Sequence, residues 1–124
     1  MKILIIEDEP DMAALLAATL EPIGLELRME RSGDGIDEIL AEYDPQVVIV
    51  DVMLFGSRLD GFDVVRHIRA TPGHEKTLVI VLTALVGKEY QEKAHAAGAD
   101  IYMGKPFSPL ELLDELRRAE IITD

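Results

Sequence analysis

Short apolar runs alternate with longer amphipathic segments along the chain. Four of the runs are almost continuously apolar, which is typical of strands covered on both faces. A fifth run, at residues 25–30, alternates apolar with charged positions, as expected of a half-exposed edge strand. The four continuous runs are residues 2–7, 46–51, 78–82 and 100–103.

The segments between the runs space their apolar residues as amphipathic helices do. The first predicted helix opens at residues 8–11, where acids favour the positive end of the helix dipole, and Gly24 closes it. The last begins with Ser108 as N-cap and Pro109 as its first residue. The expected buried side of the last helix is Leu110, Leu113 and Leu116, and that of the first is Met12, Leu15, Leu16, Thr19 and Leu20.

Strict alternation of strands and helices with short loops predicts a parallel sheet wrapped by helices on both faces. The edge-like second strand favours the order 2-1-3-4-5, a flavodoxin-like α/β fold of the (βα)5 three-layer sandwich type. This order opens a crevice between strands 1 and 3. Residues 1–124 fit a single domain, and we expect no output domain within the chain.

Composition narrows the function classes. Twenty-four acids against twelve lysines and arginines give a formal charge of −12, which disfavours direct binding of nucleic acid or of anionic membranes. No apolar stretch approaches the roughly 20 residues of a membrane span, and the amino terminus does not resemble a signal peptide. The chain has no cysteine, which excludes disulfides and thiolate metal sites. We therefore expect a cytoplasmic protein.

Polar and charged residues follow the apolar runs at the points where strands should end. Because parallel strands place their carboxyl ends along one edge of a sheet, these side chains should share one crevice. Carboxylates gathered there would repel one another, and a bound Mg²⁺ would relieve that repulsion. The residues concerned are Glu7, Asp8, Asp51, Thr83 and Lys105.

Each of these residues has a candidate role at a magnesium and phosphoryl site. Asp8 and Asp51 are the expected direct ligands of Mg²⁺, Glu7 could act through a water, and the Met53 carbonyl is a further candidate oxygen. Asp51 could also act as a nucleophile that forms an aspartyl phosphate. Lys105 would supply a positive charge to the phosphoryl oxygens and Thr83 a hydroxyl donor.

Taken singly, each residue also fits a simpler role as a helix cap, a turn residue or a solvated loop charge. The set in strand order favours the shared site. The three histidines, at positions 67, 74 and 95, show no pairing or metal spacing, and we expect them at exposed positions.

Five segments together resemble the receiver domain of two-component response regulators, over essentially the whole chain. They are residues 5–9, 48–54, 60–61, 82–84 and 105–107. The resemblance implies a phosphoprotein of a phosphorelay that is not an enzyme, in which Asp51 accepts a phosphoryl group from a sensor histidine kinase or a histidine phosphotransfer protein. It also implies that Glu7, Asp8 and Asp51 form the Mg²⁺ site.

The same resemblance implies a switch. Thr83 and Lys105 would sense the phosphoryl group, and Tyr102 matches the family's switch aromatic, which turns inward when Thr83 moves. The Lys105–Pro106 bond matches a position that is cis in the family. Helix 4, strand 5 and helix 5 would then present the signal to a downstream effector. A homodimer through the helix 4–helix 5 face is a further option, suggested by Leu85 and Leu112.

The chain departs from the family at the loop after Asp51. Phe55 stands where receivers usually carry proline, and the loop from Val52 to Leu59 looks about two residues longer than usual, with residues 56–58 inside it. Because the loop borders the crevice, the change should affect partner docking and phosphoryl lifetime more than phosphorylation itself. Apolar Met53 and Leu85 flank the site and would not activate a hydrolytic water, so we expect an aspartyl phosphate that is not unusually short-lived.

Three rival interpretations remain. A small phosphatase of the haloacid dehalogenase type also uses an aspartate nucleophile, but needs a second aspartate where Met53 stands. A receiver-like binding module that is never phosphorylated would need no complete acceptor site, although the altered loop favours it. A flavin-binding protein of the same fold would need a loop rich in Ser, Thr and Gly to hold the phosphate, and this chain has no such loop.

Overall fold

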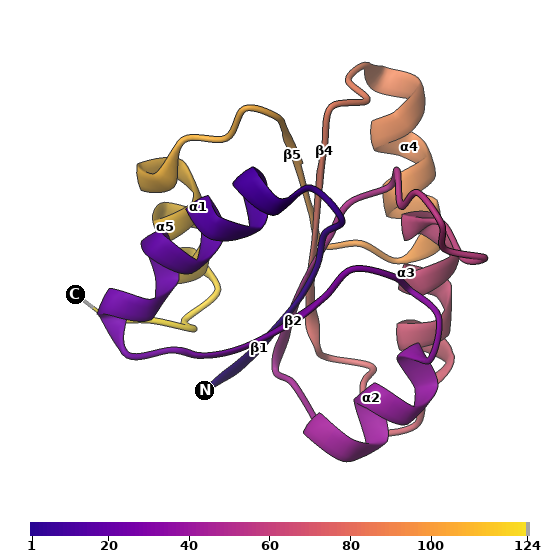
Figure 1. The fold of residues 1–124 in the computed structure, drawn as a ribbon, viewed down its shortest axis with the longest axis horizontal. Coiled ribbons are helices and arrows are strands. Elements are labelled where there is room, and N and C mark those ends of the chain that lie inside the picture. The colour runs from indigo at the N-terminus through magenta and orange to yellow at the C-terminus, as the bar shows by residue number, and fades with distance from the viewer. Residues whose placement is uncertain (124) are drawn as a thin grey trace.

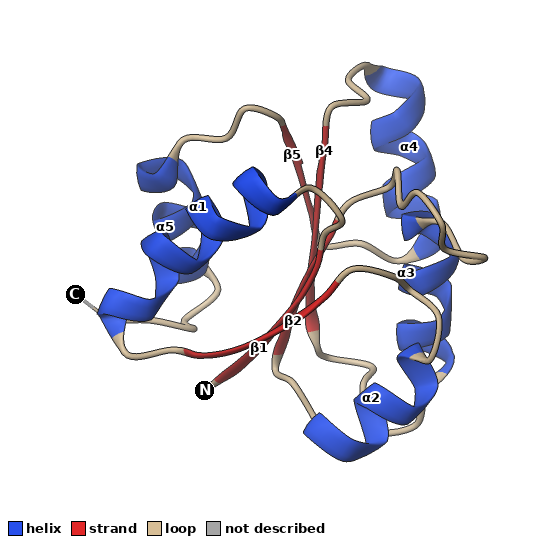
Figure 2. Cartoon of the chain, viewed as in Figure 1, coloured by secondary structure: helices blue, strands red, loops and turns tan. Residues whose placement is uncertain are grey.

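The computed structural model describes residues 1–123 as five strands and five α-helices in strict alternation. All strand pairs are parallel, and the order β2-β1-β3-β4-β5 confirms the predicted topology. Figure 2 shows the strands in red at the centre, between the helices in blue. The elements are β1 Lys2–Ile6, α1 Pro10–Leu20, a 3₁₀ turn Glu21–Ile23, β2 Glu26–Glu30, α2 Ile36–Tyr43, β3 Val47–Val50, α3 Gly61–Ala70, β4 Leu78–Thr83, α4 Lys88–Ala97, β5 Ile101–Gly104 and α5 Pro109–Arg118.

Helices cover both faces of the sheet, α1 and α5 on one side and α2, α3 and α4 on the other (Figure 1). Alternate residues of each central strand therefore enter different cores. In β1, Ile3 and Ile5 pack with α1 and α5, whereas Leu4 and Ile6 pack with α2 and α3. All four are fully buried, and each such side chain contributes about 1.5–3 kcal/mol relative to an exposed one. Burial on both faces explains the continuous apolar runs.

Helix α5 begins where predicted, but the side that it buries differs from the predicted one. Ser108 Oγ accepts the Glu111 N–H, and Pro109 is the first helical residue. Leu112 and Leu116 are fully buried, whereas Leu110 is 72% exposed. The prediction for Leu110 was wrong. Leu112 and Leu116 lie about one helical turn apart on the side that faces the sheet, and Leu110 lies on the opposite side. Burial also removes Leu112 from the suggested dimer surface.

Helix α1 shows a smaller difference of the same kind. Leu16 and Leu20 are buried as predicted, but Leu15 is an exposed side chain. Among residues 1–123, the helices are too short or too polar for any of them to cross a bilayer. The Lys105–Pro106 peptide bond is cis, as the resemblance implied.

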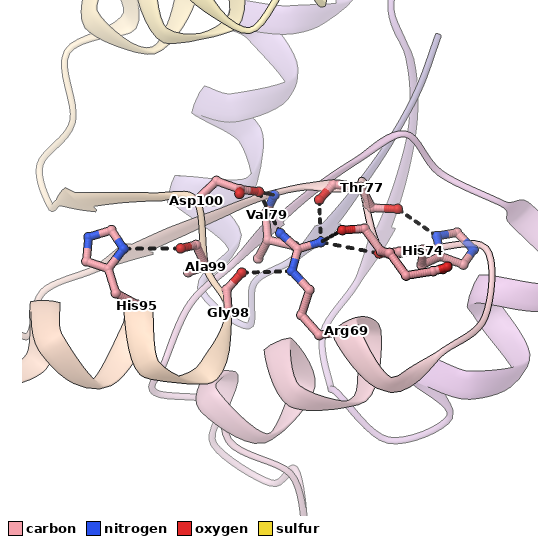
Figure 3. Close-up of polar contacts among 9 residues, drawn as sticks. Arg69, His74, Thr77, Val79, His95, Gly98, Ala99 and Asp100 are labelled. Atoms are coloured by element: carbon pink, nitrogen blue, oxygen red, sulfur yellow. Dashed lines mark hydrogen bonds and ion pairs between the residues drawn. The ribbon is translucent and has the colours of Figure 1, made fainter.

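Arg69 joins two turns at the amino-terminal ends of β4 and β5 (Figure 3). From α3, its guanidinium donates to the carbonyl of Gly98 at 2.8 Å, to that of Thr77 at 2.7 Å and to Asp100 Oδ2 at 2.6 Å. The same Asp100 oxygen accepts the Val79 N–H at 2.8 Å. One arginine therefore ties the carboxyl end of α4 to the start of β4.

His74 is buried, so the expectation of an exposed histidine was wrong at this position. Its side chain lies between two partners, with Nδ1 at 2.8 Å from Thr77 Oγ1 and Nε2 at 3.2 Å from Asp44 Oδ1. Asp44 stands thirty positions earlier in the chain, at the end of α2. Burial of a polar ring is tolerated because both nitrogens are paired. His67 also has a partner, with Nδ1 at 3.2 Å from Asp37 Oδ1.

Candidate functional site

The pairing of β1 with β3 brings the acidic residues together. Ile6 is in register with Val50, so both strands leave the sheet at the same level. The Asp51 N–H donates to the Ile6 carbonyl at 3.1 Å, which carries the pairing one residue beyond the strand end. Glu7 and Asp8 therefore emerge beside Asp51, as predicted from the strand order.

Glu7, Asp8 and Asp51 form a compact acidic cluster. Each offers a carboxylate oxygen, and these oxygens lie within 4.8 Å of one another. Glu7 is 5% exposed and Asp51 7%, whereas Asp8 is half-buried. Carboxylates brought this close out of water repel one another unless positive charge joins them.

Lys105 supplies one positive charge to the cluster. Its Nζ lies 2.7 Å from Asp51 Oδ2 and contacts Glu7 Oε1, with Glu9 Oε2 farther away at 3.8 Å. Burial lowers the pKa of this ammonium, but its hydrogen bonds to Asp51 and Glu7 outweigh that effect and hold the pKa above its ordinary value. Lys105 is thus a fixed cation between two carboxylates.

A single ammonium does not satisfy the cluster. Burial raises the pKa of Glu7 to about 7, the hydrogen bond from Lys105 opposes the rise, and Asp51 reinforces it. Glu7 Oε2 is buried and has no hydrogen-bond partner among residues 1–123. An unpaired buried oxygen beside two further carboxylates matches the hard oxygen ligands that a divalent cation such as Mg²⁺ prefers. The residues present therefore fit that ion.

The loop after β3 closes one side of the site through its backbone. The Met53 N–H donates to Asp51 Oδ1 at 3.1 Å, and the Phe55 N–H donates to Asp8 Oδ2 at 3.0 Å. The Phe55 side chain is 75% exposed. A cavity of about 380 Å³ opens here, lined by Asp8, Glu9, Asp51, Met53, Phe55, Ala84 and Lys105. It is large enough to admit a phosphoryl group.

Thr83 and Tyr102 meet at Leu85 rather than in the acidic cluster. Thr83 is buried and its Oγ1 accepts the Leu85 N–H at 3.2 Å, while the Tyr102 hydroxyl donates to the Leu85 carbonyl. Burial, with a smaller contribution from Tyr90, raises the pKa of Tyr102, so its hydroxyl keeps the proton that it donates. Ala84, the residue between Thr83 and Leu85, lines the cavity.

Three residues that had no predicted role at the site border it: Glu9, Phe55 and Ala84. Glu9 and Ala84 nevertheless lie in segments that resemble the receiver family, at residues 5–9 and 82–84. Phe55 was noticed for its side chain, but the group that contacts Asp8 is its backbone N–H. A backbone donor is present at every residue except proline, so residue type does not reveal it.

Comparison with known proteins gives the same family throughout. The response regulator receiver domain family matches residues 3–117. The phosphate regulon transcriptional regulatory protein PhoB of Rhizobium meliloti is 37% identical over 96% of this chain and 53% of its own length. An uncharacterized 14.6 kDa protein of Leptolyngbya boryana is 31% identical, over 91% of this chain and 85% of that protein. The chain spans about half the length, or less, of the first curated relatives it matches.

Solved structures similar to this chain are also described as response regulators or receiver domains. A putative response regulator from Chloroflexus aurantiacus has a TM-score of 0.88 at 28% identity and covers 98% of both chains. The receiver domain of a sensor histidine kinase from Pseudomonas aeruginosa, solved with a magnesium ion coordinated in its active site cleft, has a TM-score of 0.84 at 28% identity and covers 94% of each chain. Sequence, fold and site therefore place this chain in the response regulator receiver domain family.

Proposed function

We propose that this chain accepts a phosphoryl group on Asp51 from a phosphohistidine of a sensor histidine kinase or a histidine phosphotransfer protein. The observation that supports this most directly is the Asp51 carboxylate, held 2.7 Å from the Lys105 ammonium in an acidic cluster that opens into a cavity. A buried carboxylate with a fixed cation beside it is arranged for attack on phosphorus and for stabilisation of phosphoryl oxygens.

The transfer balances without a further reactant. A carboxylate oxygen of Asp51 forms a bond to phosphorus while the phosphorus–nitrogen bond of the donor breaks. The electron pair of that bond stays on the imidazole nitrogen, which takes up a proton from solvent water. Lys105 keeps its proton throughout and moves from pairing with carboxylates to pairing with phosphoryl oxygens.

Asp8 and Asp51 are the proposed direct ligands of Mg²⁺, with Glu7 through a water and the Met53 carbonyl as a further oxygen. When bound, the ion would neutralise carboxylate and phosphoryl charge together. The unpaired Oε2 of Glu7 supports this assignment. The magnesium ion in the cleft of the Pseudomonas aeruginosa receiver supports it by analogy.

We propose that Leu85 transmits the change to the α4–β5–α5 surface. A phosphoryl group would accept a hydrogen bond from the Thr83 hydroxyl and draw it toward Asp51, away from the Leu85 N–H that now donates to it. Because the Tyr102 hydroxyl donates to the carbonyl of the same residue, a shift of Leu85 would move Tyr102 on β5 as well. A downstream effector that contacts this surface would then distinguish the two states.

We also propose that the domain acts as a phosphoacceptor rather than as a turnover enzyme, and that it does so in the cytoplasm. This acidic domain would not itself contact nucleic acid or membrane. Two relatives are named as DNA-binding regulators. Contact with DNA would therefore be made by an attached effector domain rather than by the receiver itself. A homodimer would have to use exposed groups such as Val86 and Leu110 rather than buried Leu112.

The test is the intact mass of the purified chain after incubation with acetyl phosphate or phosphoramidate and Mg²⁺. Wild type should gain one phosphoryl group, and Asp51→Asn, which keeps the shape of the side chain, should gain none. Equal gain in both proteins would place the acceptor elsewhere. No gain in wild type would favour the phosphorylation-independent binding module, and steady turnover of phosphomonoesters would favour the phosphatase.

A further inference from the structure

The loop of residues 52–59 is fastened at both ends to groups distant in sequence. At one end the Phe55 N–H contacts Asp8 of the acidic cluster, and at the other Ser57, Arg58 and Leu59 contact the turn before α2. We propose that Asp34 and Ser57 are positioning residues that hold this loop against Asp8 and thereby set the affinity of the acidic cluster for a divalent cation. The inference rests on the proposed Mg²⁺ site.

Asp34 and Ser57 form the latch between the loop and the turn. Asp34 Oδ1 accepts the N–H groups of Arg58 at 3.0 Å and Leu59 at 3.4 Å. Ser57 Oγ accepts the Gly33 N–H at 3.0 Å and donates to the Leu59 carbonyl at 2.6 Å. Two side chains thus satisfy backbone groups of a loop that has no strand or helix of its own, which is what fixes its conformation.

The turn that carries Asp34 is itself firmly seated. Gly33 approaches α3 so closely that a Cβ at this position would lie 2.4 Å from Val64 Cγ2. A larger residue at this position would force Val64 to shift, so the turn packs directly against α3. Because Asp34 and Ser57 bond the loop to this turn, the contact of the turn with α3 restrains the loop as well.

Little chain separates the latch from Asp8. Leu54 is buried in the core under α2, α3 and α4, and its carbonyl accepts the Ser57 N–H at 3.3 Å. Between these two anchors lie only Phe55 and Gly56, the latter at a φ of 78°. Glycine adopts this left-handed conformation without strain. The Phe55 N–H therefore has little freedom to move away from Asp8.

Asp8 receives two contacts from this unit. The Phe55 N–H donates to its Oδ2 at 3.0 Å, and Arg31, just before the turn, donates to its backbone carbonyl at 3.4 Å. A carboxylate oriented by hydrogen bonds binds a metal ion with less loss of freedom, and removal of such outer partners typically costs 10- to 100-fold in affinity. The loop of residues 52–59 thus acts on the site through Asp8.

The experiment compares Mg²⁺ binding by isothermal titration calorimetry in wild type, Asp34→Ala, Asp34→Asn and Ser57→Ala. Asp34→Ala and Ser57→Ala should weaken Mg²⁺ binding by roughly 10-fold, at the low end of the range for outer partners. Asp34→Asn loses the same charge as Asp34→Ala but keeps an acceptor oxygen, so it should stay within about threefold of wild type. Thermal unfolding confirms that each variant is folded.

Amide hydrogen exchange in the metal-free proteins provides a second readout. Residues 55–59 should exchange faster in Asp34→Ala and Ser57→Ala, whereas β1 and β3 should be unchanged. If exchange accelerates while Mg²⁺ affinity stays the same or rises, the latch does not position Asp8 for the ion and the inference is overturned. If wild type and Asp8→Asn bind Mg²⁺ equally weakly, the proposed site itself fails, and the inference fails with it.

Discussion

At the scale of single residues, the site is short of positive charge. Lys105 pairs with Asp51 and Glu7, yet Glu7 keeps a buried oxygen without a partner among residues 1–123. In the metal-free state, burial and the nearby Asp51 carboxylate raise the pKa of Glu7 to about 7. Glu7 therefore holds a proton below that pH, and the cluster then carries one negative charge less. A proton and the proposed Mg²⁺ would therefore compete for the acidic cluster.

This competition predicts a pH dependence of stability in the absence of metal. Because the folded pKa of Glu7 lies above its ordinary value of 4.5, the folded state binds the extra proton between about pH 4.5 and 7. The free energy of unfolding should therefore fall as pH rises through this window, by on the order of 3 kcal/mol at most. Glu7→Gln should lose this dependence.

Urea unfolding of both proteins in EDTA at pH 5 and pH 8 measures the difference. Other carboxylates and histidines titrate in both proteins, so only the change in wild type relative to Glu7→Gln reports on residue 7. Parallel pH profiles would show that Glu7 titrates normally in the folded state.

At the scale of elements, α5 tests which leucines hold a helix to the sheet. Leu112 is fully buried, so Leu112→Ala should lower the free energy of unfolding by about 2–5 kcal/mol. Leu110 is mostly exposed, so Leu110→Ala should change it by no more than about 0.5 kcal/mol. The two variants delete the same atoms from one helix, and urea midpoints compare them directly. Similar losses in both would mean that α5 packs in another register.

Arg69 gives a second prediction for elements. Arg69→Ala removes the guanidinium donor from the carbonyls of Gly98 and Thr77 (Figure 3). Loss of the donor for the two carbonyls should together cost about 2–4 kcal/mol of unfolding free energy. Asp100 is exposed and keeps the Val79 N–H, so its loss of Arg69 should add little.

Arg69→Lys is the matched control for this prediction. It keeps the charge but cannot reach three acceptors with one ammonium, so it should recover less than half of the loss. Urea denaturation checks both variants. Full recovery by lysine would show that charge alone, rather than the fork of donors, holds the two turns.

The elements also show how much of the fold and of the site the sequence pattern predicts. Continuous apolar runs, the alternating run at residues 25–30 and helical spacing together predicted the five strands and five α-helices of residues 1–123. Burial on both faces of the sheet is what leaves the continuous runs at residues 2–7 and 46–51. The meeting of Glu7 with Asp51 followed from strand order alone. What the patterns missed depends on distant pairs, such as His74 with Asp44, or on backbone donors such as the Phe55 N–H. Neither leaves a periodic signal.

At the scale of the whole molecule, the charge of −12 and the acidic cluster should respond to cations in different ways. Any salt screens the general repulsion and stabilises the folded chain somewhat. Only an ion bound at the cluster adds a saturable gain, equal to RT ln(1 + [Mg²⁺]/Kd). The two contributions separate when ionic strength is held constant.

We therefore expect Mg²⁺ at about 100 times its Kd to raise the free energy of unfolding by about 2.7 kcal/mol over NaCl of equal ionic strength. Asp8→Asn should lose most of this gain while keeping the response to NaCl, since it removes one ligand and only one of 24 acids. Thermal unfolding of wild type and Asp8→Asn in both salts, with EDTA added to reverse the effect, measures it. Equal gains in the two proteins would mean that Mg²⁺ acts by screening alone, because a bound ion must depend on the carboxylate that holds it.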